Sequence, residues 1–212
     1  MGRMTFEQMQ IELSLNLAGV APSPDRLKQW VNFAIIDLAT EYQFDELRTT
    51  DDFSISDGVT EYNEPPNLLG IVDIKVDEKS LRRMRRLWSE ADEPAQPLYY
   101  MRKDGKIVVW PGPDDDYDGY IEYMRIPDNL EAANEVSPFA AHWDLIIVQR
   151  ATYHGLFAIG KIAEADVWLI RSRQIQDRKL KEEDISKEVP HEGLRVAWDF
   201  DDLVDNPPHV GT

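Results

Sequence analysis

Residues 97–126, PLYYMRKDGKIVVWPGPDDDYDGYIEYMRI, decide the fold that we predict for this chain. A run rich in β-forming residues leads into a turn that contains Asp104-Gly105, and residues 107–110 lead out of it, which is the pattern of a β-hairpin. The segment 111–113 ends the second strand, because proline offers no backbone donor and glycine supplies unusual dihedrals. Residues 120–126 alternate in polarity and predict a third strand. We therefore predict a three-stranded meander.

Composition limits the classes of protein to which the chain can belong. Its 212 residues include 23 Lys and Arg against 40 Asp and Glu, a net charge of −17. This balance argues against general affinity for nucleic acid, which depends on cations that neutralise phosphates. The absence of cysteine excludes disulfides, thiolate metal sites and cysteine nucleophiles. No signal-peptide core and no apolar run of membrane-spanning length is present, so we expect a soluble protein.

Helical patterns come before the β-rich region. Thr5 and Gln8 have the spacing of a capping box, and apolar residues follow at helical intervals until Gly19. A second helix is predicted to begin at Ser23, with Pro24 at its first position. These features predict two short antiparallel helices.

The pattern changes to that of strands after residue 47. The runs 49–56 and 59–63 flank Asp57-Gly58 and predict a second hairpin. Residues 71–76 predict a further strand with one mostly apolar face, followed by a turn at 77–79. We expect five or six short strands in a small sheet or sandwich, with the adjoining helices covering one face.

The C-terminal half of the chain returns to helical patterns. After a polar linker, Ser137 and Pro138 are predicted to begin a helix that is apolar around much of its circumference and that breaks or bends near Gly160. A further helix follows.

The predicted class is α+β: N- and C-terminal helices form a helical bundle around an inserted small antiparallel β-sheet or sandwich, with an extended C-terminal tail. The predicted organisation is one domain over 1–187, made of a helical pair (5–46), a β-rich insertion (47–126) and helices (137–187), and an arm over 188–212.

Two segments are candidates for contacts with other molecules. The dense basic cluster at 82–86 is either a solvated loop or short helix, or a surface that contacts an acidic neighbouring subunit or nucleic acid. Because the chain is so acidic, we favour the subunit contact between the two functional alternatives. In the C-terminal arm, apolar and polar residues alternate, which predicts a strand that adds to a partner's sheet edge. The alternative is an arm that folds back on its own domain. The basic residues are Arg82, Arg83, Arg85 and Arg86, and the apolar residues of the arm are Leu194, Val196, Trp198, Phe200 and Leu203.

Three motif-like features could indicate a site for chemistry. The string 155–161 has the glycine spacing of a phosphate-binding loop, but Ile162 stands where Ser or Thr should ligate magnesium, so we expect the glycines to allow close helix packing or a bend. Residues 114–119 match the start of a calcium loop, but Arg125 replaces its bidentate glutamate, and a tight acidic turn anchored by Tyr117 is the preferred interpretation. The four histidines lack metal-ligand spacing, and we expect His142 and His154 to serve a helix interface or cap. We expect no enzyme activity and no cofactor or metal site.

Taken in order, these features resemble the head-to-tail adaptor (connector) proteins of tailed bacteriophages. The resemblance covers about residues 5–175, and the basic cluster and the acidic arm depart from it. The segments that carry it are 30–47 (WVNFAIIDLATEYQFDEL), the strand pair 51–66, Pro97-Leu-Tyr-Tyr, the 106–113 strand with its terminal Trp-Pro-Gly-Pro, Asp114 with Tyr117, and the helix 139–160.

The resemblance implies a structural virion protein without catalysis. Such adaptors form a ring, commonly of twelve copies, that sits beneath the portal in the neck of the virion, extends the DNA channel and offers a surface to tail proteins such as a nozzle or tube. Genomic DNA would pass through without sequence-specific binding, and no membrane is involved. By the same resemblance, the 188–212 arm would bind the portal. The protein would be made in the host cytoplasm and act in the virion during viral DNA ejection.

Other classes of function remain open at this stage. The aromatic residues of the meander suggest a carbohydrate- or peptide-binding module, and exposure of half of them on one face would favour it. A calcium- or nucleotide-dependent enzyme built on the two degenerate motifs is the other alternative. The aromatic residues concerned are Tyr99, Tyr100, Trp110, Tyr117, Tyr120 and Tyr123.

Overall fold

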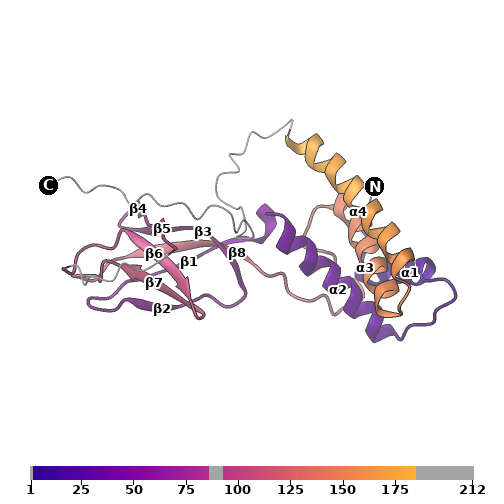
Figure 1. Ribbon diagram of the computed structural model, residues 1–212, viewed down its shortest axis with the longest axis horizontal. Helices are drawn as coiled ribbons and strands as arrows, with labels where there is room; N and C mark the ends of the chain where they lie inside the picture. Colours follow the sequence, from indigo (N-terminus) through magenta and orange to yellow (C-terminus); the bar gives the residue numbers. More distant parts are fainter. Residues whose placement is uncertain (1, 86–92, 185–212) are drawn as a thin grey trace. The chain divides into compact units, whose positions relative to one another are not determined.

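The computed structural model describes residues 2–85 and 93–184, with side chains up to residue 181 (Figure 1). Contacts between residues divide the chain into a unit of residues 1–177 and a unit of residues 178–212. The first unit contains three helices, two four-stranded sheets and most of a fourth helix. The predicted α+β class is confirmed. The predicted boundary between 187 and 188 lies outside the described residues.

The two N-terminal helices begin where the sequence predicts. α1 spans Phe6–Asn16, and its capping box is complete: Gln8 N donates to Thr5 Oγ1 at 3.3 Å, and Thr5 N donates to Gln8 Oε1 at 2.9 Å. α2 spans Pro24–Glu41 and follows Ser23 in extended conformation. A short 3₁₀ turn, η1 (Asp45–Leu47), then leads into the strands.

The third helix begins later than predicted. α3 spans Asp144–Ala158 and follows a 3₁₀ turn, η2 (Ala141–Trp143), whereas we expected a helix from Ser137 and Pro138 onward. The physical reason is that Phe139 is buried outside any helix, stacked on Phe44 with ring centroids 4.0 Å apart. The break near Gly160 is confirmed by its φ of +82°, after which α4 spans Ile162–Asp184.

Helix α3 is buried on several sides, as predicted. α1 contacts it through a hydrogen bond of 3.2 Å from Asn16 Nδ2 to Thr152 Oγ1. α4 contacts it through Gln176, whose Oε1 accepts a hydrogen bond of 3.0 Å from Arg150. Residues 150 and 152 are about 200° apart around a helix, so α1 and α4 contact different sides of α3. α2 packs on α3 as well.

The strands form two sheets, with strand orders β1-β8-β3-β4 and β2-β7-β6-β5. All neighbours pair antiparallel except β5 and β6, which pair parallel. The strands are β1 (Arg48–Asp52), β2 (Glu61–Asn63), β3 (Leu68–Val76), β4 (Lys79–Ser80), β5 (Arg82–Arg83), β6 (Tyr99–Lys103), β7 (Lys106–Trp110) and β8 (Gly119–Arg125).

Both predicted strand groupings need correction. The β6–β7 hairpin is confirmed, but the three-stranded meander is wrong, because β8 pairs with β1 and β3 in the other sheet. The second predicted hairpin is also wrong: β1 pairs with β8 and β2 pairs with β7. The turn at Asp57-Gly58 exists, but it carries the chain from one sheet to the other. Period-two alternation is compatible with many antiparallel partners, so the sequence pattern did not discriminate between them.

The two sheets share one hydrophobic core. Its buried members come from β3 and β8 in one sheet and from β6 and β7 in the other, together with neighbouring loop residues. The members that the structure describes all belong to residues 53–123, so the two sheets cover each other. The expectation that helices cover one face stays a prediction. The fully buried residues at its centre include Ile74, Val76, Ile107, Val109 and Ile121.

Candidate functional site

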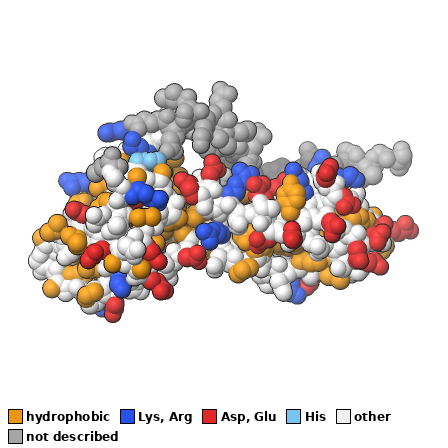
Figure 2. All heavy atoms as spheres, turned by 180° about the vertical axis from the view of Figure 1, so that it is seen from behind, with side chains coloured by type: hydrophobic (Ala, Val, Ile, Leu, Met, Phe, Trp, Pro, Cys, Tyr) orange, Lys and Arg blue, Asp and Glu red, His pale blue; other side chains and the backbone are white. Residues whose placement is uncertain are grey.

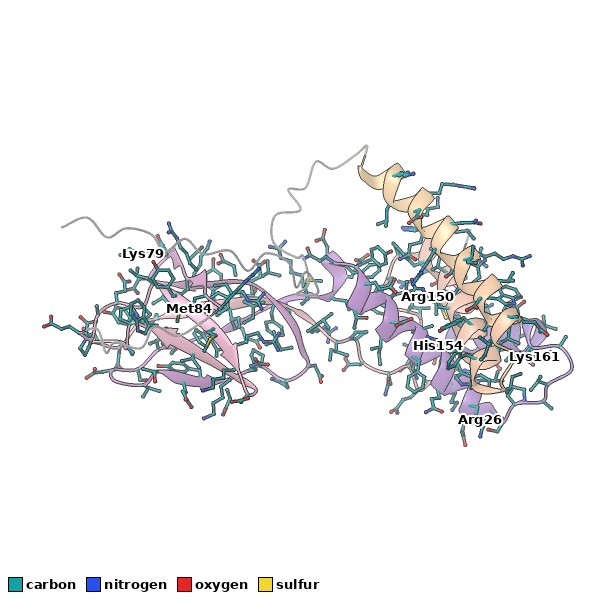
Figure 3. All side chains as sticks on the ribbon, in the orientation of Figure 1. Arg26, Lys79, Met84, Arg150, His154 and Lys161 are labelled. Atoms are coloured by element: carbon teal, nitrogen blue, oxygen red, sulfur yellow. The ribbon has the colours of Figure 1, made fainter. Side chains whose placement is uncertain are left out.

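The most polar buried region of the helices is a cluster centred on Arg150 of α3 (Figure 3). Its side chain is 0% exposed. One terminal nitrogen donates to Asp37 Oδ2 at 3.1 Å and to Glu41 Oε1 at 2.8 Å, and the other donates to Glu41 Oε2 and to Gln176. The cluster therefore joins α2, α3 and α4 through one guanidinium.

Electrostatics within this cluster favour the ionised groups. Burial alone would lower the pKa of Arg150, but hydrogen bonds and charge interactions with Glu41 and Asp37 outweigh it and raise that pKa. The imidazole of His154 is the largest cause of a lowered pKa at Asp37, and Arg150 lowers it further. His154 Nε2 lies 3.4 Å from Asp37 Oδ2, without the alignment of a hydrogen bond. The predicted role of His154 at a helix interface is confirmed.

The cluster combines hydrogen bonds between three helices with buried polar atoms that lack partners in the described part of the chain. Arg150 Nε, Gln149 Oε1 and Gln176 Nε2 are buried and have no hydrogen-bond partner among the residues that the structure describes. Within the described ranges, no group of three or more His, Asp or Glu residues is arranged to hold a metal ion. Sequence reasoning missed this cluster, although an arginine within the otherwise apolar pattern of α3 was a visible signal.

The acidic loop before β8 is a tight turn held by its own side chains. The Tyr117 hydroxyl donates to Asp114 Oδ1, and this hydrogen bond is the main cause that raises the pKa of Tyr117 to about 12. Asp57 N donates to Asp116 Oδ1 at 2.9 Å, which ties the loop to the turn at Asp57-Gly58. The predicted anchoring role of Tyr117 is confirmed.

Gly119, the sixth residue of the calcium-loop pattern, has a packing reason to be glycine. A Cβ at this position would lie 2.2 Å from the backbone oxygen of Lys75 and 3.0 Å from that of Phe53. The close approach of three backbone segments therefore requires glycine here, whether or not an ion binds.

The string with phosphate-loop spacing runs from the last turn of α3 through the connection to α4. Gly155 is inside α3, where a Cβ would come within 3.1 Å of both Leu17 and Trp30. Close packing of α1 and α2 on α3 is thus the role of this glycine, as predicted. Lys161 pairs with Glu164 at 3.1 Å on the surface.

The basic cluster lies at the edge of one sheet. Arg82 and Arg83 form β5, so the expectation of a loop or short helix is wrong for these two residues. Arg82 N donates to Leu98 O at 2.8 Å, and the side chains of Arg82, Arg83 and Arg85 are exposed. Arg86 lies outside the described residues. The subunit contact remains a prediction.

The predicted portal-binding residues also lie outside the described part of the chain. They are Leu194, Val196, Trp198, Phe200 and Leu203.

The aromatic residues of the alternative binding module do not form one exposed face. Tyr100 and Tyr123 are buried at 5% exposure each, and only Tyr120 reaches 36%. Tyr99, Trp110 and Tyr117 are half-buried. The strand residues among them are divided between the two sheets. This arrangement lacks the exposed face that the binding-module hypothesis requires.

The structure exposes apolar residues on two helices. Ile11 and Leu15 of α1 are 53% and 64% exposed, and Val167 and Ile170 of α4 are 47% and 55% exposed. Ile11 and Leu15 fall off the apolar stripe of α1, whereas the buried side of α4 is formed by Ala165, Ser172 and Gln176. On the face shown in Figure 2, acidic and basic side chains are interspersed.

Comparison with known proteins places these features in a family. Among residues 2–85 and 93–184, no helix has the length and apolar character needed to cross a membrane. A search of curated proteins finds no match to the chain. The model of the family described as SU10 adaptor protein matches residues 4–184, which includes every helix and strand described above. The chain therefore belongs to the SU10 adaptor protein family.

Proposed function

We propose that this protein forms a ring, of twelve copies, that joins the portal to the tail and extends the DNA channel of a phage virion. The family match over residues 4–184 is the observation that carries the proposal. Members of the family are phage adaptors, which are structural proteins that associate with other head and tail proteins in the virion neck.

The charge of the chain suits a DNA channel. With a net charge of −17, the protein offers little general attraction to phosphates, so DNA would slide past it during ejection. The short basic edge formed by Arg82, Arg83 and Arg85, extended in sequence by Arg86, is proposed to contact an acidic surface of the neighbouring subunit. A cation cluster in so acidic a protein has many carboxylates available as partners.

The 188–212 arm is proposed to bind the portal through Leu194, Val196, Trp198, Phe200 and Leu203. Burying the first four of these side chains contributes roughly 6–12 kcal/mol gross, and fixing about eight backbone residues costs on the order of 8–16 kcal/mol. One arm alone would therefore bind weakly. Several arms displayed on one ring would bind firmly through their high effective concentration.

Electron microscopy of the full chain mixed with the portal protein of the same virus tests this function. We expect a closed ring stacked coaxially on the portal, with the two central channels aligned. Particles of portal alone, together with a monomeric chain in the same sample, would contradict the proposal. The full chain without portal is the matched sample that shows whether the ring forms independently.

A further inference from the structure

Strand β1 forms a free edge, because it stands at the end of the strand order β1-β8-β3-β4. Phe53 N donates to Gly119 O at 2.9 Å, so Phe53 and every second residue before it face β8 in this antiparallel pair. The backbone N–H and C=O groups of Thr50 and Asp52 therefore point away from β8. Within the described part of the chain, these groups have no hydrogen-bond partner, and both residues are exposed. We call Thr50 and Asp52 the β1 edge.

Strand β5 forms a free edge of the other sheet, at the end of the order β2-β7-β6-β5. Arg82 N donates to Leu98 O and Met84 N donates to Tyr100 O, both at 2.8 Å. Since alternate residues of a strand face its partner, Arg83 directs its N–H and C=O away from β6. No residue that the structure describes forms a hydrogen bond with these two groups. We call residues 82–85 the β5 edge.

The β1 and β5 edges lie on opposite sides of the paired sheets. Leu81 alone joins β4 to β5, so the β4 end of one sheet lies beside the β5 end of the other (Figure 1). At the opposite end, the rings of Phe53, next to β1, and Tyr62 of β2 are in contact, with centroids 5.2 Å apart. Because β1 and β4 are the two ends of one sheet, a molecule presents the β1 edge on one side and the β5 edge on the other.

The surroundings of the β1 edge are acidic. Asp52 forms no ion pair with a described residue, and Asp51 accepts a hydrogen bond of 2.8 Å from the uncharged hydroxyl of Tyr123. The other charged residues around this edge are the exposed Asp45, Glu46 and Asp57, the acidic residues of the loop 114–118, Arg48 paired with Glu122, Arg125 paired with Asp128, and Lys75 of β3.

The β5 edge is basic along its whole length. Residues 82–85 include three arginines and no acidic residue, and these arginines are exposed without an ion pair to any residue described. Glu78 comes four residues before Arg82, about 13 Å along an extended chain, which exceeds the screening length of about 8 Å at physiological salt. The other charged residues on this side are Asp73, which accepts a hydrogen bond from Ser80, Asp77, Lys79, which donates to Gln96, and Glu93.

These charges determine which edges can pair. Like charges opposed across two strands are destabilising, so charged residues keep an edge from pairing with its own kind. Two β1 edges would bring Asp52 beside Asp52, and two β5 edges would bring Arg83 beside Arg83. A β1 edge and a β5 edge instead bring opposite charges together while their backbone groups pair.

Strand β2 is the other free edge on the β1 side, and its carboxylates are already neutralised within the chain. Glu61 pairs with Lys106 at 2.7 Å, and Glu64 pairs with Arg102 at 2.7 Å. The unpaired carboxylate of Asp52 therefore makes β1 the better partner for a basic strand.

We propose that the β1 edge of one copy adds to the β5 edge of the next copy, with Asp52 close to Arg83 across the contact. Joining two different surfaces is a heterologous contact, and its repetition generates a ring when the rotation closes. Each contact is short, so the stability of the assembly depends on every copy making it twice in a closed ring. The inference rests on the proposed ring and names the surface that the three arginines of β5 contact.

Reversal of charge with rescue tests this contact. Asp52→Arg and Arg83→Asp, made in separate full-length chains, would each place like charges together at every contact of the ring. We therefore expect the chain concentration at which half of the protein is assembled to rise on the order of tenfold for either variant. A chain with both substitutions has the opposite charges restored and should assemble like the parent chain.

An equal mixture of the two single variants should also assemble, because each variant supplies the charge that the other lacks. Sedimentation velocity measures assembly of the chain alone, electron microscopy measures it with portal present, and circular dichroism checks that each variant is folded. The matched control is Glu61→Arg, which makes the same change of charge at an exposed residue of β2 and should assemble like the parent chain.

Three results would overturn the inference while leaving the proposed function intact. One is a ring that both single variants form as readily as the parent chain. Another is a ring that the single variants lose and that neither the double variant nor the mixture restores. The third is rescue of Arg83→Asp by Glu61→Arg, which would assign the contact to β2.

Two further results separate the inference from the proposed function. Oligomers of the parent chain that depend on Asp52 and Arg83 in this way, but do not engage the portal, would support the inference and contradict the proposed function. A parent chain that stays monomeric both alone and with portal would contradict both.

Discussion

At the scale of single residues, Arg150 is the largest fully buried side chain that the structure describes. Its guanidinium contacts the side chains of Asp37 and Glu41, which are 38% and 34% exposed. Water therefore still solvates the two carboxylates, whereas protein surrounds the guanidinium. Removing one member of such a group leaves the others without a counter-charge.

We predict that Arg150→Ala lowers the free energy of unfolding by about 3 kcal/mol, the lower end of the range for broken buried pairs, because Asp37 and Glu41 can still reach water. Arg48→Ala is the control, since Arg48 pairs with Glu122 at 2.5 Å on the surface, where such pairs contribute about 0–1 kcal/mol. Urea unfolding measures both. Equal effects of the two substitutions would contradict the role assigned to Arg150.

Asp37 gives the cluster a defined dependence on pH. His154 is the main cause that holds the pKa of Asp37 below its ordinary value of 3.8. Since the folded chain therefore binds this proton less readily than the unfolded chain, the stabilisation is complete above the ordinary value and is lost as pH falls through the lowered pKa.

We predict that Asp37→Asn makes the free energy of unfolding less dependent on pH between about pH 5 and about pH 2. Chemical unfolding at several pH values measures this slope. Glu7→Gln, which removes one exposed negative charge from α1, is the control for net charge. An acid slope in Asp37→Asn as steep as in the parent chain would contradict the assignment.

At the scale of elements, β8 depends on one glycine at its first residue. Gly119 pairs with Val76 of β3, and Phe53 N donates to Gly119 O at 2.9 Å. A methyl group there would collide with backbone atoms, which cannot move away as a side chain can.

We predict that Gly119→Ala destabilises the chain by about 3 kcal/mol, the upper end of the usual cost of overpacking. Gly112→Ala is the matched control, because the nearest atom to its added Cβ would be Thr60 Cγ2 at 3.4 Å, and we expect a change within about 0.5 kcal/mol. Thermal unfolding followed by circular dichroism compares them. Similar midpoints for the two variants would show that β3 and β8 can separate at little cost.

At the scale of the whole molecule, the proposed arm is expected to be separable from the folded unit. The described members of the core of the sheets lie within 53–123, and the described members of the Arg150 cluster extend no further than Gln176.

We predict that deleting residues 190–212 abolishes attachment to the portal and leaves the thermal midpoint of the remaining chain unchanged. Co-sedimentation with portal measures attachment, and circular dichroism measures folding. The control is a full-length chain with Trp198→Ala and Phe200→Ala, which should weaken attachment without shortening the arm. Normal attachment of the truncated chain would refute the assignment of the arm.

Local signals allowed the helices and several strands to be predicted from the sequence. The capping box at Thr5, the start at Pro24 and the break at Gly160 each depend on residues within one or two turns, so neighbouring residues suffice to predict them. The β6–β7 hairpin was predictable for the same reason, because its turn and both strands are adjacent in sequence.

Long-range packing determined the rest. β8 alternates in polarity wherever it pairs, and only the three-dimensional arrangement placed it between β1 and β3 instead of beside β7. The same holds for Arg150, whose partners Asp37 and Glu41 are more than a hundred residues away in sequence. Which side chains are buried, and which residues they contact, depends on the surfaces that meet in the folded chain. The exposed apolar residues of α1 and α4 could therefore be identified only from the structure, which shows the opposite sides of these helices to be buried.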